Sequence, residues 1–293
     1  MTRIEVLKTY KIYIGGKFPR TESGRFYNPK SGGKSIGNIC LSSRKDFRNA
    51  VVAARSAFNG WLGATAYNRS QILYRIAEML EGRKAQFVEE LTQQGNTKPQ
   101  AEKEVNSSID RIIYYAGWCD KYVQLFSAVN PVATSHFNFT VPEPTGVVAV
   151  IAPEASGLLG LITTIMPIIA SGNTCVVLAS ENKPLCAVTF AEVLNSSDVP
   201  GGVVNILTGK RKELIPHMAS HMDVNAFLYG GNDKKEIIEI QKAAVDNLKR
   251  VVLKDFNDLS TSNHESPYYI EEFLEMKTTW HPIEKIGASG SGY

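Results

Sequence analysis

The chain has 293 residues, of which 43% are apolar and 21% are charged, a composition typical of a globular protein with a substantial core. Its net charge of +3 is small, and the basic clusters at 209–213 and 232–236 contain no aromatic residues, which argues against a nucleic-acid-binding protein. The longest apolar run, 157–172, is too short to cross a bilayer and contains Pro167, and the N-terminus lacks the apolar stretch of a signal peptide, so we expect a cytoplasmic protein with no membrane partner.

The four cysteines are scattered along the chain, at Cys40, Cys119, Cys175 and Cys186. None is part of a C-x-x-C pair, and Cys175 and Cys186 lie in strongly apolar stretches. This pattern is typical of small core residues in a reducing compartment. We therefore do not expect a disulfide, a metal site or a nucleophile at these positions.

The N-terminal part, 1–145, predicts a small strand pair followed by helices. Residues 10–18 alternate apolar and polar up to Gly15–Gly16, which predicts a hairpin. Ser43 and Asp46 predict the capped start of a first helix. Two further helices are predicted by apolar residues at helical spacing, namely Leu73, Ile76, Ala77 and Leu80, and then Val105, Ile109, Ile112, Ile113 and Ala116. The proline-bearing stretch 129–145 predicts an extended strand or linker.

The central part, 146–258, alternates short apolar strands with helical segments. Five strands are predicted, at 146–152, 174–178, 203–207, 225–229 and 250–253. This order predicts an α/β fold with a doubly wound parallel sheet, whose ligands bind beyond the carboxyl ends of the strands. Neither a G-x-G-x-x-G fingerprint nor a P-loop occurs there. The glycine-containing turn at 229–232 could offer backbone amides to a phosphate, and a flexible turn explains it equally well.

The segments resemble, in order and spacing, those of the aldehyde dehydrogenase superfamily. The resemblance rests on YIGGKF at 13–18, GVVAVIAP at 146–153, SGNTCVV at 171–177, VPGGVVNILTG at 199–209 and NLKRVVL at 247–253. It implies a sheet that binds NAD or NADP and an aldehyde oxidation that proceeds through a cysteine thiohemiacetal. The positions at which it implies coenzyme contacts are Ile151, Ala152, Pro153, Glu181, Gly209, Gly231 and Asn232.

The departures from the family pattern fall on its functional positions. Ala155 stands where the family carries the asparagine that stabilises the oxyanion, and one such donor is worth roughly 100- to 1000-fold in rate. Leu178 replaces the lysine that binds the adenine ribose, and the turn 229–232 replaces a Phe-Thr-Gly-Ser turn near the pyrophosphate. Lys254 replaces the general-base glutamate, and a protonated lysine cannot accept a proton. We expect the strand end that carries Lys254 and Asp255 to face water or a partner.

The C-terminal part, 259–284, resembles the family's last helix and oligomerisation strand. The family's Gly-Gln-x-Cys segment does not precede it, so the resemblance implies that the catalytic domain is missing, as in the non-catalytic second half of the long family-16 aldehyde dehydrogenases. Met276, Thr278 and Trp280 occupy alternate positions, which predicts an edge strand with two faces. An exposed edge strand is an aggregation hazard unless it is paired. Residues 285–293 predict a flexible tail.

We therefore expect an aldehyde-dehydrogenase-like pseudoenzyme subunit. It docks through its C-terminal strand to a full-length NAD(P)-dependent aldehyde dehydrogenase, to another copy of itself, or to both, and its own NAD or NADP binding is weak or lost. One alternative is an NAD(P)-dependent oxidoreductase that acts on aldehydes with a divergent or partner-supplied active site. Another alternative is a nucleotide-binding sensor without catalysis.

Two pairs of side chains have a further interpretation. Glu154 and Glu181 follow consecutive strands and could form a general acid–base pair, whereas a solvated rim explains them more simply. His217 and His221 have the i, i+4 spacing of metal ligands, although no third ligand is evident in the sequence.

Overall fold

The computed structural model describes residues 6–283, and the tail predicted at 285–293 lies outside them. A five-stranded parallel sheet forms the centre of the molecule, with the order β10-β9-β8-β11-β12. Its strands are β8 (Val147–Ile151), β9 (Thr174–Leu178), β10 (Val204–Leu207), β11 (Ala226–Tyr229) and β12 (Arg250–Leu253). The four strands from β8 to β11 are buried along their whole length, as expected of a sheet covered on both faces. The predicted α/β fold is confirmed.

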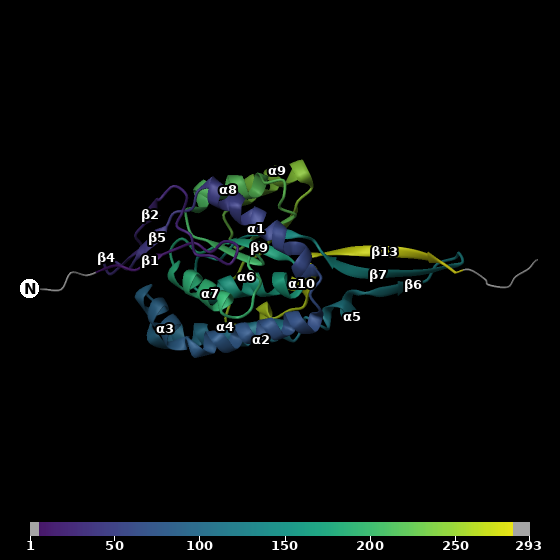
Figure 1. Cartoon of the computed structure of the whole chain (residues 1–293), viewed down its shortest axis with the longest axis horizontal. Helices are drawn as coiled ribbons and strands as arrows, with labels where there is room; N and C mark the ends of the chain where they lie inside the picture. The colour runs from purple at the N-terminus through teal and green to yellow at the C-terminus, as the bar shows by residue number, and fades with distance from the viewer. Residues whose placement is uncertain (1–5, 284–293) are drawn as a thin grey trace, which may run out of the picture.

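Helices cover both faces of this sheet, and each face has its own apolar core (Figure 1). One face packs against α1 (Arg44–Leu62), α8 (Arg211–Ser220) and α9 (Lys234–Ala244). The other packs against α2 (Ala66–Gly82), α4 (Lys98–Ala116), α6 (Leu159–Ala170) and α7 (Leu185–Asn195), with α3 (Lys84–Gln93) and α5 (Tyr122–Phe126) beside them. Because helices from the N-terminal part contribute to both cores, the packing crosses the predicted domain boundary at 145.

The predicted starts and faces of the helices agree with the structure, with one exception. The Ser43 hydroxyl accepts a bond from the Asp46 amide while the Asp46 carboxylate accepts one from the Ser43 amide, which is a complete capping box for α1. The apolar positions predicted for α2 are buried. In α4, however, Ile113 is 43% exposed, because it lies on the outer side of a helix whose inner side is already occupied by its neighbour Ile112.

The C-terminal end of the buried helix α6 is satisfied by side chains of other helices. The Trp61 indole donates to the Ile169 carbonyl at 2.9 Å, and the Arg69 guanidinium donates to the Ala170 carbonyl at 3.2 Å. Both side chains are buried. These bonds supply donors for carbonyls that have no partner within the helix, and they fix α1 and α2 against the sheet layer.

The N-terminal hairpin predicted at 10–18 is reduced to a tight turn. Ile14 and Lys17 exchange two backbone bonds of 3.0 Å around the two glycines. The preceding residue, Tyr13, pairs instead with Ile206 of β10, so this segment extends the edge of the central sheet. The remaining short strands are β1 (Thr9–Tyr10), β2 (Phe26–Tyr27), β3 (Lys30–Ser31), β4 (Lys34–Ser35) and β5 (Asn38–Cys40).

A three-stranded antiparallel arm projects from the body of the molecule (Figure 1). It consists of β6 (Ala128–Asn130), β7 (His136–Pro144) and β13 (Leu274–Pro282), in the order β13-β7-β6. The predicted C-terminal edge strand is therefore present as β13, paired with β7 along its whole length. It is preceded by the short helix α10 (Tyr268–Glu271).

Lys249 provides a test of the packing between the sheet and α8. Its side chain is buried, and its ammonium donates to the carbonyls of Ala219 at 2.7 Å and His221 at 2.9 Å. Burial lowers its pKa from 10.5 to about 8. Between these two pH values the unfolded chain binds more protons at this position than the folded chain, so Lys249 makes the free energy of unfolding rise with pH.

We predict that Lys249→Met removes this rise and, because both carbonyls lose their donor, lowers the free energy of unfolding at pH 7 by about 1–3 kcal/mol. Urea unfolding of both proteins at pH 7, 8.5 and 10 gives the comparison. All other titrating groups are shared, so equal pH slopes in the two proteins would contradict the prediction.

Candidate functional site

A crevice lies at the carboxyl ends of the strands, at the point where the order of the sheet reverses. β9 and β10 lie on one side of β8, and β11 and β12 lie on the other, so the loops after β8 and β11 flank the reversal. This is where ligands of open α/β sheets bind. The crevice encloses about 320 Å³, and its lining includes Pro153, Glu154, Arg211, Gly231, Asn232 and Asp255.

The seven positions with implied coenzyme contacts do not all reach this crevice. Pro153, Gly231 and Asn232 line it. Ile151 and Ala152 are buried where β8 ends, and the Ala152 amide continues the strand pairing by donating to the carbonyl of Leu178 in β9 at 3.0 Å. The other two positions, Glu181 and Gly209, follow β9 and β10 and are absent from the lining.

The Glu154 carboxylate is held at the centre of the strand-end loops. It forms an ion pair of 2.7 Å with Arg211. It also accepts bonds from the Ser180 hydroxyl at 2.9 Å, from the Glu181 amide at 3.0 Å and from the Asn182 amide at 3.1 Å. Glu154 therefore joins the loops after β8, β9 and β10 through its carboxylate.

The Glu181 carboxylate has its own set of partners. One oxygen lies 2.5 Å from the Lys210 ammonium, and the other accepts the backbone amide of Arg211 at 3.3 Å. Glu154 and Glu181 are therefore paired with different cations rather than with one another. This arrangement corresponds to an ordered polar rim and gives no direct contact between the two carboxylates.

The turn after β11 is closed by its own side chains. A Cβ atom added to Gly231 would lie 2.8 Å from the Tyr229 ring, and the Tyr229 hydroxyl donates to Glu236 at 2.5 Å. The Asp233 carboxylate accepts the amides of Lys235 at 2.7 Å and Glu236 at 3.4 Å. The Lys235 and Glu236 amides at the start of α9 are therefore capped within the chain, whereas these bonds do not involve the backbone amides of the turn 229–232.

Arg211 is the residue of this site that sequence reasoning missed. Its side chain is 13% exposed, and besides pairing with Glu154 it donates to the Ala152 carbonyl. The signal available in the sequence is the run TGKRK, which directly follows β10 and therefore lies at a strand end where ligands of such sheets bind. A long cation directly after a buried strand is placed to reach across the strand-end loops.

Lys254, at the position of the family's general base, is held by the chain itself. Its ammonium forms an ion pair with Glu272, and it lies 4.4 Å from the centre of the Tyr269 ring. Burial raises the pKa of Glu272. The strand end is exposed at Leu253 and Asp255, as expected. The Lys254 side chain itself is 25% exposed and pairs within the chain, because the segment between β12 and β13 folds back and brings Glu272 to the strand end.

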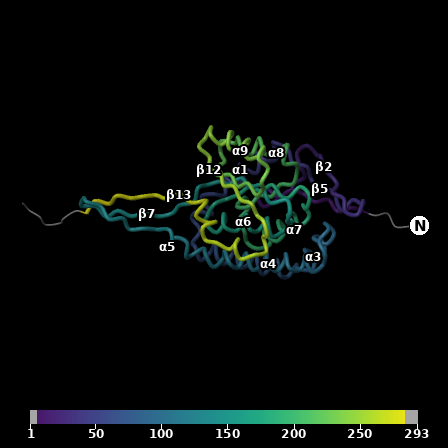
Figure 2. The backbone as a smooth tube through the Cα atoms, turned by 180° about the vertical axis from the view of Figure 1, so that it is seen from behind, coloured from purple at the N-terminus to yellow at the C-terminus, as the bar shows by residue number. Residues whose placement is uncertain are grey.

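That segment, 254–273, is anchored by a buried arginine of α4. Figure 2 shows it leaving β12, passing α6 and returning to β13. The Arg111 guanidinium is 1% exposed and donates to the carbonyls of Leu259 and Thr261 at 3.2 Å, to the Glu265 carboxylate at 3.3 Å and to the Thr163 hydroxyl at 2.9 Å. The segment is therefore a fixed part of the body of the molecule.

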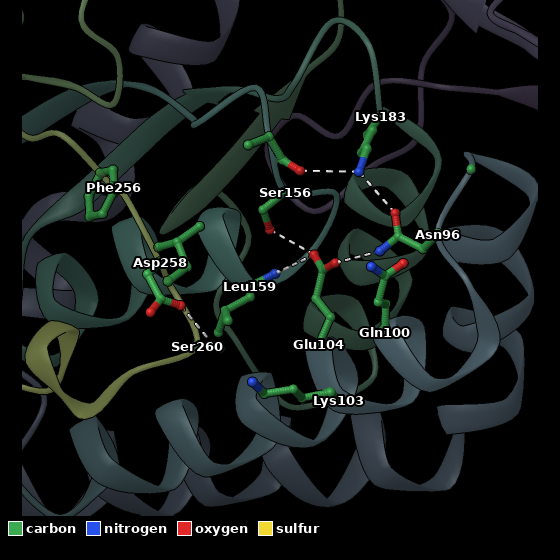
Figure 3. A pocket seen from close by; sticks show the side chains of 13 residues that line it. Asn96, Gln100, Lys103, Glu104, Ser156, Leu159, Lys183, Phe256, Asp258 and Ser260 are labelled. Atoms are coloured by element: carbon green, nitrogen blue, oxygen red, sulfur yellow. Dashed lines mark hydrogen bonds between the residues drawn. The ribbon is translucent and has the colours of Figure 1, made fainter.

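A second cavity, of about 460 Å³, lies between α4, the start of α6 and this segment (Figure 3). One oxygen of Glu104 accepts the Ser156 hydroxyl at 2.7 Å and the amides of Leu158 at 2.9 Å and Leu159 at 3.2 Å. The carboxylate thereby caps the N-terminus of α6. Ala155 is exposed, and its carbonyl accepts Lys183 at 3.1 Å, so neither the Ala155 side chain nor the capped amides offer a free donor to an oxyanion.

The cysteines are not placed to act as nucleophiles. All four are free and buried. Burial raises the pKa of Cys119 to about 12 and raises the pKa values of Cys175 and Cys186 well above their ordinary value. A thiolate is the reactive form, so these thiols are poor nucleophiles in this conformation.

The two histidines do not share a helix face. α8 ends at Ser220, and His221 follows it with extended backbone angles, whereas His217 lies within the helix. Within residues 6–283 no group of three or more His, Cys, Asp or Glu side chains is placed to hold a metal ion. The same range contains no helix that is both long and apolar enough to span a membrane.

Comparison with known proteins gives consistent matches. The Aldehyde dehydrogenase family matches residues 19–254. The chain is 32% identical to retinal dehydrogenase 2 of Gallus gallus over 257 residues, which is 85% of this chain and 49% of that protein. It is 31% identical to an aldehyde dehydrogenase of Aspergillus niger over 249 residues, covering 83% of this chain and 49% of that one.

Solved structures agree with these matches. The NAD+ complex of an aldehyde dehydrogenase from Bacillus cereus has a TM-score of 0.80 and 25% identity, covering 84% of this chain and 50% of that one. PnpE in complex with nicotinamide adenine dinucleotide has a TM-score of 0.79 and 28% identity, covering 83% and 50%. The chain thus spans about half the length of these relatives, and the family match stops at 254, where the anchored segment begins.

The ion pair at the end of β12 gives a test by charge reversal. We predict that Lys254→Glu lowers the free energy of unfolding by about 2–4 kcal/mol, because it places two partly buried carboxylates together. The double variant Lys254→Glu/Glu272→Lys recovers most of that loss, because it restores opposite charges. Urea unfolding of the three proteins measures both effects. A double variant no more stable than Lys254→Glu would contradict the pairing.

Proposed function

The chain belongs to the aldehyde dehydrogenase family, and on that premise we propose that it acts as a non-catalytic subunit of an aldehyde dehydrogenase assembly. In this role it binds a full-length NAD(P)-dependent aldehyde dehydrogenase, or another copy of itself, and stabilises or regulates the assembly. The observation that carries the proposal is the pairing of Lys254 with Glu272. The general-base position of the family is held here by a cation engaged in an internal ion pair.

The oxyanion position supports the same proposal. Ala155 has no side-chain donor, and the nearby amides of α6 are capped by Glu104. An acyl-transfer site needs preorganised donors directed at the developing negative charge. The proposal therefore assigns the chemistry, and the NAD or NADP that it consumes, to the partner.

The arm supports the docking half of the proposal, because it exposes apolar side chains on both faces. Val129 lies opposite Phe139 on one face, with Phe137 two residues away, and Val129 and Phe137 are 68% and 46% exposed. Trp280 and Met276 lie on β13 and are 57% and 42% exposed. Such surfaces mark interaction sites, and aromatic residues are frequent binding hot spots.

β13 also lies at the edge of the three-stranded sheet, and no described strand pairs with its outer side. A free edge can add a strand from another chain through backbone hydrogen bonds. In the family that this chain belongs to, the strand that β13 resembles pairs with a neighbouring subunit. We further propose that the chain resembles the non-catalytic half of family-16 aldehyde dehydrogenases.

We propose a cytoplasmic location for this subunit. Four free, buried cysteines suit a reducing compartment. The mouse relatives include both a cytosolic and a mitochondrial 10-formyltetrahydrofolate dehydrogenase, so the location of the relatives does not decide the matter.

Purification of the chain from its natural source, followed by native mass spectrometry, tests the docking role. We predict a complex that contains a full-length aldehyde dehydrogenase or further copies of the chain. Met276→Ala/Trp280→Ala weakens the association by about 10- to 100-fold, because it removes two exposed apolar anchors. Ile238→Ala, at a similarly exposed apolar position on α9, serves as the matched control and leaves the association unchanged.

Two results would count against the proposal. A chain that stays monomeric at micromolar concentration, with no aldehyde dehydrogenase bound, removes the docking role. Aldehyde-dependent NAD(P)H production by the isolated chain, abolished by replacing one of its cysteines, removes the non-catalytic role and supports the enzyme alternative.

A further inference from the structure

The crevice at the sheet reversal raises a question that the proposed subunit role leaves open, namely whether this chain binds a dinucleotide itself. Such a ligand needs three things here: space, hydrogen-bond donors for its two phosphates, and a surface that is not strongly negative. Each requirement can be compared with the residues that line the crevice.

The space is taken up by side chains of the chain itself. The Arg211 guanidinium extends from the first residue of α8 into the crevice, where Glu154 and the Ala152 carbonyl hold it. The glycines after β11 leave no free space for a phosphate either. A Cβ atom added to Gly230 would lie 2.8 Å from the Ile151 carbonyl oxygen, and one added to Gly231 would lie 2.8 Å from the Tyr229 ring. The remaining volume is about 320 Å³.

Several hydrogen-bonding groups near the crevice are already engaged. The N-terminal amides of α9 bind the Asp233 carboxylate, and those of α6 bind the Glu104 carboxylate. Both oxygens of Glu181, one of the implied coenzyme contacts, are occupied by Lys210 and by the Arg211 amide. A phosphate at these helix amides, or a ribose at Glu181, would have to displace a bond that is already made.

The charge of the crevice lining is also unfavourable for binding a dinucleotide. The crevice is lined by one guanidinium, that of Arg211, and by four carboxylates, those of Glu154, Asp233, Glu236 and Asp255. A pyrophosphate would bring further negative charge to this surface, and a low-dielectric crevice strengthens the repulsion.

From these three observations we infer that the chain does not bind NAD or NADP, and that Arg211, bridged to Glu154 and the Ala152 carbonyl, closes the crevice. The strand-end loops are then joined by internal bonds at the place where open α/β sheets bind their ligands. Arg211 is a positioning residue of the scaffold, and the crevice contributes to stability rather than to ligand binding. This removes the sensor alternative as well.

Thermal unfolding of the isolated chain with and without coenzyme tests the inference. A coenzyme bound with a Kd of about 0.1 mM would raise Tm by roughly 5–9 °C at 5 mM. We expect no shift with NAD or NADP, while a full-length NAD-binding aldehyde dehydrogenase in the same buffer shows one. A coenzyme-dependent shift in the wild-type chain would overturn the inference.

The variant Arg211→Ala distinguishes two roles of Arg211, namely joining the strand-end loops and binding the phosphate of a coenzyme. As a bridge, Arg211 contributes in the absence of coenzyme, so its loss lowers Tm by about 3–8 °C. The matched control Lys212→Ala, an exposed cation one residue further along α8, changes Tm by less than about 2 °C. An unchanged Tm in Arg211→Ala would overturn the bridging role. Both measurements use the isolated chain, so their failure is distinct from a failure of the assembly experiment.

Discussion

The buried guanidinium of Arg111 is the constraint on which the C-terminal part of the molecule depends. A buried charge is tolerated only when its donors are paired, and most partners of Arg111 belong to the segment that connects β12 to β13. Its pairing holds Leu259 and Phe256 against Leu159 of α6, and the returning chain brings Glu272 to Lys254. The segment therefore covers the strand ends and delivers β13 to the arm.

Because this segment covers the strand ends, it determines which surfaces of the molecule are left to bind other molecules. At the strand ends, carboxylates cap the N-termini of α6 and α9, and Glu154 and Glu181 pair with Arg211 and Lys210, so internal bonds occupy much of the region usually used for chemistry. The arm shows the opposite property, because it exposes apolar side chains, and the outer edge of β13 pairs with no strand among the described residues. We therefore expect the arm, rather than the closed crevice, to be the part of the molecule that binds other molecules.

The sequence predicts those features that depend on local pattern. Continuous apolar runs predict the buried strands, and the spacing of Ser43 and Asp46 predicts the start of α1, because both signals lie within a few residues. The roles of Arg111 and Arg211 were not predictable in this way. Each pairs with groups that are distant in sequence, and such pairs become visible only when the loops meet in space. The partner of Lys254 was missed for the same reason.

Hydrogen–deuterium exchange of the chain, free and bound to its partner, tests the central claim most directly. The claim is that the chain's own segment 254–273 closes the strand ends and that the arm binds the partner. It predicts slow exchange of the backbone amides of this segment in both states, and new protection confined to 128–144 and 274–282. Rapid exchange of 254–273 in the free chain, or its release when the partner binds, would contradict the claim.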